Sequence, residues 1–138
     1  MELLHTRGEF VWLVYNPARE HVEVGENWMI IDRRERRGVL VQIIEMSVPD
    51  LPDILLQLIR REASEREVEI HRSEETSRRY LIVENMKYAR GRIIREILKG
   101  EEIKFKRWSG YVPSRTVEFK KIDDEELIEY LRKESDET

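Results

Sequence analysis

The chain contains no cysteine among its 138 residues. This absence excludes a disulfide framework and any metal or thiol site built on cysteine, so an intracellular, cytoplasmic location is expected. Long apolar runs are also missing. Glu2, His5, Arg7 and Glu9 interrupt the N-terminal residues, and no run approaches the roughly 18 residues that a membrane-spanning helix requires. We therefore expect neither a secretory signal nor a membrane partner.

Glycine and histidine are scarce as well. The six glycines are scattered singly, so the sequence lacks the glycine-rich loop followed by Lys and Ser or Thr that surrounds nucleotide phosphates. The three histidines, His5, His21 and His71, do not occur as pairs roughly three to five residues apart, the spacing that metal motifs use. The sequence thus predicts no metal site, no cofactor and no catalytic residue.

Charge is what the sequence has in abundance. Charged residues make up 39% of the chain, with Arg commoner than Lys, a composition typical of hyperthermophile proteins. The net charge is only -4, but its sign is unevenly distributed. Lys87 to Arg107 holds eight basic and three acidic residues, a difference of +5, whereas Glu118 to Thr138 holds four basic and nine acidic residues, a difference of -5.

The first half of the chain reads as antiparallel strands joined by short turns, because aromatic and β-branched residues alternate between turn signals. The expected strands are Glu9–Tyr15, His21–Val24, Asn27–Asp32 and Val39–Met46, with a charged hairpin tip at 33–38. Both faces of Asn27–Asp32 are apolar, which indicates a strand covered on two sides. Three or four short strands within 46 residues favour a small barrel or a tightly curled sheet.

The second half mixes helices and strands. Leucine and isoleucine spacing after Asp50 predicts a helix at about 50–63, followed by an exposed excursion at 64–79 and a short strand, Tyr80–Val83. Met86 to Leu98 fits both periodicities, but Gly91 costs a helix about 1 kcal/mol relative to Ala, so a strand is expected. Further strands are expected at Ile103–Trp108 and Arg115–Lys121. Asp123 caps a final helix at about 123–133, with Glu126 at the capping-box position.

These elements predict a single domain over residues 1–138 with 40% hydrophobic residues to fill one core. The expected fold class is mainly β (α+β). It is a small antiparallel β-barrel with strands within about 9–46 and 80–121, an inserted helix and a C-terminal helix.

The basic segment that ends at Trp108 is the best binding signal. Arginine and lysine neutralise phosphates, and an exposed aromatic ring beside them can stack on a base. The candidate nucleic-acid or partner-binding residues are Arg90, Arg92, Arg95, Lys104, Lys106, Arg107, Trp108 and Arg115. The alternative is a solvated face that pairs with acidic helices of its own chain or a neighbour's, with Trp108 in the core. The negative net charge favours this alternative.

The sharpest enzyme hypothesis combines Pro49-Asp50 with Glu118-Phe119-Lys120. It is similar to the metal-dependent nuclease pattern in which two carboxylates hold Mg²⁺ and the lysine contacts the attacked phosphate. Asp50 also suits the role of helix cap, and Glu118 alternates with Val117 and Phe119 as an outward strand residue. An Mg-dependent nuclease is therefore kept as an alternative hypothesis.

Three segments together resemble the HAS-barrel, the N-terminal domain of archaeal HerA-type DNA translocases, a barrel shared with rotary ATP synthase subunits. They are Val24-Gly25-Glu26-Asn27-Trp28-Met29-Ile30-Ile31, Gly38-Val39-Leu40-Val41-Gln42-Ile43-Ile44-Glu45, and Gly110-Tyr111-Val112-Pro113-Ser114-Arg115-Thr116-Val117-Glu118 leading into Asp123-Asp124-Glu125-Glu126-Leu127. The Gly25 segment matches the turn before an inward strand. Pro113 to Val117 matches the approach to the last strand.

In that family the barrel sits on a hexameric ATPase ring and contacts a partner nuclease, and the complex resects DNA ends during repair. The resemblance implies a non-catalytic assembly module whose protein partner is a nuclease or a hexameric ATPase motor, with DNA contact and homo-oligomerisation as further expectations. No residue matches the motor's catalytic positions, so ATPase activity is not implied. The chain is expected to be either a domain of a longer translocase or a stand-alone relative.

Overall fold

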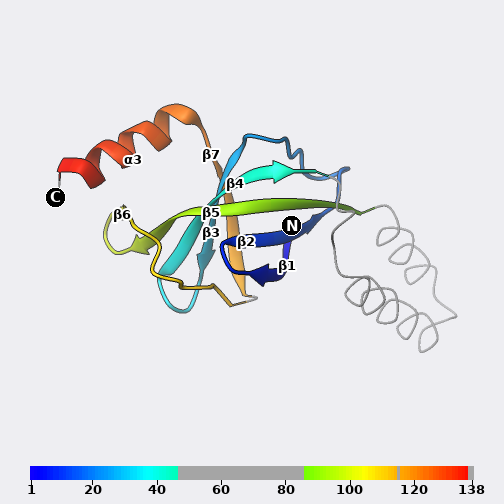
Figure 1. The fold of residues 1–138 in the computed structure, drawn as a ribbon, viewed down its shortest axis with the longest axis horizontal. Coiled ribbons are helices and arrows are strands. Elements are labelled where there is room, and N and C mark those ends of the chain that lie inside the picture. The colour runs from blue at the N-terminus through cyan, green and yellow to red at the C-terminus, as the bar shows by residue number, and fades with distance from the viewer. Residues whose placement is uncertain (47–85, 115, 137–138) are drawn as a thin grey trace, which may run out of the picture.

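A computed structural model describes residues 1–46, 86–114 and 116–136 of the chain. Seven strands and one helix, α3, are defined in this part (Figure 1). Their bounds are β1 Glu2–Arg7, β2 Phe10–Tyr15, β3 Asn27–Asp32, β4 Arg37–Glu45, β5 Lys87–Lys99, β6 Ile103–Lys106, β7 Val117–Ile122 and α3 Asp124–Asp136. The predicted helix at 50–63, the excursion at 64–79 and the strand at 80–83 lie outside the described residues. None of the helices in the described part has the length and apolarity to cross a membrane.

All seven strands belong to one antiparallel sheet with the order β1-β2-β5-β4-β3-β7. The long strand β5 organises it. One edge of β5 pairs with β4, while its other edge pairs first with β2, over 87–92, and then with β6, over 96–99. The sheet curls into a half-barrel, so the predicted mainly β fold with a C-terminal helix is confirmed.

Each face of the sheet carries its own apolar cluster. The larger cluster gathers side chains from strands at both ends of the sheet order, such as Leu3 on β1 and Phe119 on β7, which only the inside of the curl can bring together. The smaller cluster lies on the outer face, where Leu127, Tyr130 and Leu131 of α3 cover it. Strand β3 separates the two clusters, and all six of its residues are buried, as its two apolar faces predict.

The ambiguous segment around Gly91 is a strand, as predicted. Ala89, Gly91 and Ile93 alternate into the inner core between more exposed neighbours. A Cβ atom added at Gly91 would lie 2.1 Å from the Cγ1 atom of Val41 on β4. The glycine is therefore required by close strand packing, which is a common reason for glycine in a strand interior.

The predicted strand His21–Val24 is wrong. Only Val22 is buried there, Val24 is 59% exposed, and the segment ends in a turn where Gly25 has φ of 92°. The chain rejoins the sheet at Gly25 and Glu26, whose backbone groups bond to those of Ile43 at 2.8 Å. One apolar contact does not bury enough surface to hold an extra strand.

Other elements also differ from expectation, and the strand predicted at Ile103–Trp108 ends at Lys106. Strand β1 was not predicted, and its pairing with β2 shifts register between Leu3 and His5, a bulge that interrupts the alternation a strand prediction relies on. The helix begins where expected, because the amide of Glu126 donates to Oδ1 of Asp123 at 2.8 Å, but it continues to Asp136.

Candidate functional site

The residues of the predicted basic surface are distributed over several places. Arg90, Arg92 and Arg95 lie on β5, Lys104 and Lys106 lie on β6, and Arg107 and Trp108 follow β6 directly. Arg115 lies outside the described residues. The sheet brings β5 and β6 side by side, with Glu96 opposite Lys106 and Leu98 opposite Lys104.

The three arginines of β5 each pair with an acidic residue from a different element. Arg90 pairs with Glu45 of β4 at 3.0 Å, Arg92 with Glu9 before β2 at 3.0 Å, and Arg95 with Glu134 of α3 at 3.1 Å. These pairs offset most of the positive charge that the sequence places on this strand. Of the three partners, only Glu134 lies on an acidic helix, which is the kind of partner that the self-pairing alternative expected.

Trp108 is a half-buried side chain that packs against the inner core. Its Nε1 group donates to the backbone oxygen of Tyr111 at 2.7 Å. The indole therefore stabilises the turn of the loop between β6 and β7. A ring that is held in this way is less available to stack on a base, which is the role that the sequence suggested.

Glu96 is the centre of a more organised cluster inside the mouth of the curl. Its side chain is 0% exposed, yet it carries a charge that four donors satisfy. Oε2 accepts from Nη2 of Arg37 at 2.9 Å and contacts Nζ of Lys106 at 3.1 Å. Oε1 accepts from the hydroxyl of Ser109 at 2.5 Å and from its backbone amide at 3.2 Å.

Glu96 thus holds the start of the loop between β6 and β7 through Ser109. Asp32, at the end of β3, holds a later part of this loop through Ser114. It is 1% exposed, and its Oδ2 atom accepts from the amide of Ser114 at 3.0 Å. Oδ1 accepts from the amides of Arg34 and Glu35 at 2.9 and 3.4 Å, which fixes the turn between β3 and β4. We call Asp32, Arg37, Glu96, Lys106, Ser109 and Ser114 the carboxylate cluster.

Tyr111 packs against the inner core and lies in the loop that both carboxylates hold. The guanidinium of Arg37 lies 4.0 Å from the centre of its ring, a cation–π contact. Burial, assisted by the negative charges of Asp32 and Glu35, raises the pKa of the Tyr111 hydroxyl to about 12. The phenol is therefore neutral over the physiological pH range.

Hydrogen bonds decide the ionisation of both carboxylates. Burial alone would raise the pKa of Glu96, but the bonds from Ser109, Arg37 and Lys106 outweigh it and lower the pKa to about 2. Bonds from Ser114 and Arg34 lower the pKa of Asp32 to about 2 as well. Both groups are thus permanent anions near neutral pH, which suits them to hold a loop and not to transfer protons.

The nuclease-like pattern is only partly placed. Glu118 and Lys120 lie on β7 with exposed side chains, and Asp50 lies outside the described residues. Within residues 1–46, 86–114 and 116–136, no three acidic or histidine side chains come together as a group that could hold a metal ion.

The structure also brings together cations that the sequence reasoning treated as an ordinary hairpin tip. Arg33, Arg34 and Arg36 occupy the turn between β3 and β4, and the amide of Lys99 donates to the backbone oxygen of Arg36 at 2.9 Å. Arg107 follows Lys106, at the end of β6 away from the residue that pairs with Lys99. We call Arg33, Arg34, Arg36 and Lys99 the basic end. The arginine-rich run at 33–36 is visible in the sequence. That Lys99 lies beside this run follows only from the pairing of β4 with β5.

Searches of protein-family models and of curated proteins find no match for this sequence.

Proposed function

We propose that this domain is a non-catalytic assembly module of a DNA-processing machine, which docks a nuclease or a ring-forming ATPase. The carboxylate cluster is the main support. The two buried acidic groups of the described part are saturated by donors of their own chain, and their pKa values of about 2 suit an ionised anchor. Such groups position a loop for contact with a partner, and they have no proton to give to a substrate.

The resemblance to the HAS-barrel supports the choice of machine. Its three segments correspond to β3, β4 and the loop that leads into β7, and these strands are neighbours in the sheet. Glu96 and Asp32 fix the last of these segments through Ser109 and Ser114. The proposal thus places the recognition surface on a rigid scaffold, which lowers the entropy cost of docking.

Direct nucleic-acid binding through residues 87–108 has less support. The guanidinium groups of Arg90, Arg92 and Arg95 already pair with carboxylates, so phosphate binding there would have to displace existing ion pairs.

Two measurements on the purified chain test the proposal. The first monitors ATP hydrolysis and cleavage of labelled DNA with Mg²⁺ present, where we expect rates equal to the buffer blank. The second isolates the tagged chain from cells of its source, with the tag alone as the control, and identifies enriched proteins by mass spectrometry. We expect a nuclease or a ring-forming ATPase, and expect the purified partner to form a complex with the chain in sedimentation velocity.

Turnover of DNA or ATP by the chain alone would overturn the proposal. Isolation of partners that include neither a nuclease nor an ATPase, or failure of the purified partner to bind, would overturn the assignment to a DNA-processing machine.

A further inference from the structure

The cations of the basic end differ from several other cations of the described surface because they form no ion pairs with described residues. Arg33, Arg34, Arg36 and Lys99 are all exposed. Within the described part of the chain, none of these four side chains forms an ion pair, in contrast to Arg37, Arg90, Arg92, Arg95 and Lys106. Three exposed acidic residues, Glu35, Glu101 and Glu102, occupy the same turns, so cations exceed anions by one. This end keeps a positive surface after internal pairing.

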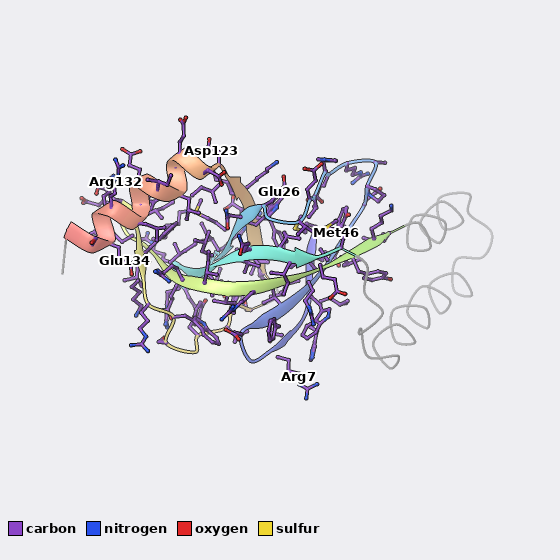
Figure 2. The ribbon with its side chains drawn as sticks, turned by 45° about the horizontal axis from the view of Figure 1, so that its top comes forward. Arg7, Glu26, Met46, Asp123, Arg132 and Glu134 are labelled. Atoms are coloured by element: carbon purple, nitrogen blue, oxygen red, sulfur yellow. The ribbon has the colours of Figure 1, made fainter. Side chains whose placement is uncertain are left out.

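The opposite end of the same strands carries negative charge. Strand β7 runs from Val117, opposite Asp32 beside the basic end, to Ile122, opposite Asn27 at the far end of β3. Helix α3 begins there, and Figure 2 shows Asp123 at the same end as Glu26. The helix has Asp124, Glu125, Glu126 and Glu129 in its first two turns, with no basic residue between Asp123 and Leu131.

The carboxylates of these first two turns are also not used internally. Asp124, Glu125, Glu126 and Glu129 form no ion pair with any described residue. The helix contacts the sheet through Leu127, Tyr130 and Leu131. The basic end and the first two turns of α3 therefore carry charges of opposite sign that have no ion-pair partner among the described residues.

Exposed apolar side chains accompany both charged surfaces. Of the four large hydrophobic residues exposed in the described part, Leu98 (38%) lies near the end of β5, and Val112 (42%) lies in the loop that Glu96 and Asp32 anchor. Ile128 (50%) lies in the acidic half of α3. Apolar centres surrounded by charge of opposite sign are what a complementary protein contact requires.

We infer that the basic end of one copy binds the acidic half of α3 of a second copy, in a head-to-tail contact. This inference rests on the proposed assembly function and specifies one of its contacts. The two surfaces are different, and α3 begins at the end of β3 opposite the basic end, so the contact is heterologous and leaves one free surface of each kind at the ends of a dimer. Such contacts repeat, and they produce a closed ring or an open filament.

Light scattering coupled to size-exclusion chromatography tests the contact on the full chain across a concentration series. At about 0.05 M salt we expect a mass above the 16.7 kDa of one chain, and at about 0.5 M salt a return towards that mass, because the charges are screened. Arg33→Glu with Arg34→Glu should weaken association at least about 10-fold, and so should Glu125→Lys with Glu129→Lys.

The matched control is Arg7→Glu with Arg19→Glu, which changes the net charge equally at exposed arginines outside the basic end and should associate like the wild type. The decisive sample is a mixture of the two interface variants. Each is expected to remain a monomer alone, and the mixture should associate, because it restores a native basic end facing a native acidic helix. Circular dichroism of each variant checks that the fold is retained.

A wild-type chain that stays monomeric at low salt would overturn the inference, and so would a mixture that stays monomeric. The proposed function would survive this outcome if the purified partner still binds the monomer. A labelled-oligonucleotide titration provides the competing outcome. DNA binding by a monomeric wild type that Arg33→Glu with Arg34→Glu abolishes would assign the basic end to nucleic acid and reject the head-to-tail contact.

Discussion

Replacing Glu96 by glutamine removes one buried negative charge with almost no change in shape. The oxygen of glutamine can still accept from Ser109, but Arg37 and Lys106 lose the anion that joins β4, β5 and β6 at the mouth of the curl. We expect the variant to fold, because Arg37 and Lys106 are 36% and 44% exposed and can turn to water. Its free energy of unfolding should be lower.

The size of the loss follows from the pKa. The surrounding donors lower the pKa of Glu96 from 4.5 to about 2. Each pKa unit corresponds to about 1.4 kcal/mol, so the ionised form contributes about 3 kcal/mol to folding at pH 7. Because the side chain is fully buried, solvent screening at the carboxylate itself is small.

The same shift fixes how the loss depends on pH. The folded pKa lies below the unfolded one, so the contribution is complete above about pH 5 and disappears as the pH falls through 4.5 towards 2. Glutamine cannot ionise. The difference in unfolding free energy between wild type and Glu96→Gln should therefore shrink from about 3 kcal/mol at pH 7 to about 1 kcal/mol at pH 3. Asp32 titrates in both proteins and cancels in this difference.

Urea denaturation monitored by tryptophan fluorescence measures both quantities, since Trp12, Trp28 and Trp108 are distributed over the sheet and the loop. Glu101→Gln is the control, because Glu101 is exposed and near the same end of the sheet. It should change stability by less than about 0.5 kcal/mol. A difference for Glu96→Gln that is equal at pH 7 and pH 3 would refute the electrostatic reasoning.

Three further substitutions test the fold itself. Gly91→Ala should destabilise by about 1–3 kcal/mol, because its Cβ would lie 2.1 Å from Cγ1 of Val41, and adding Val41→Ala should make the cost less than additive in a double-mutant cycle of urea unfolding. Asp123→Ala should lose about 1 kcal/mol with the cap of α3, seen as a lower thermal midpoint, and an unchanged midpoint would argue against the cap. Arg36→Gly should gain up to about 1 kcal/mol, because Arg36 has φ of 51° and glycine adopts this conformation without a Cβ clash; a lower midpoint would contradict this.

Most of the strands could be predicted because apolar residues repeat every second position in a strand and about every 3.6 positions in a helix, and the two patterns can be distinguished in the sequence. Asn27–Asp32 was recognised as a strand buried on both faces from its six residues alone, and Asp123 was recognised as a cap from one residue and its spacing. The strand His21–Val24 was wrong because three of its four residues face solvent, and alternation in so short a segment does not report burial.

The carboxylate cluster could not be predicted because its partners come from distant segments. Arg37 and Glu96 are 59 residues apart, and only the pairing of β4 with β5 brings them together. In the sequence Glu96 is one acid within a basic segment, which gave no reason to distinguish it from Glu101 or Glu102. The strand register decides which of the three is buried.

The basic segment shows the converse limit. The sequence correctly located an excess of cations, but it could not tell which are paired. Arg92 bonds to Glu9, 83 residues earlier, whereas the turn containing Arg33 and Arg34 keeps its charges unpaired among the described residues. Cations that look alike in the sequence therefore differ in the fold. Some form ion pairs, and others have no ion-pair partner among the described residues.

The most direct measurement is the pKa of the Glu96 carboxyl, followed by carbon-detected NMR in a pH titration with Glu96→Gln as the assignment control. An ionised structural anchor should titrate at about 2, well below the ordinary 4.5. A midpoint near neutrality would contradict the non-catalytic reading, because such a carboxyl exchanges protons in the range that a general acid uses.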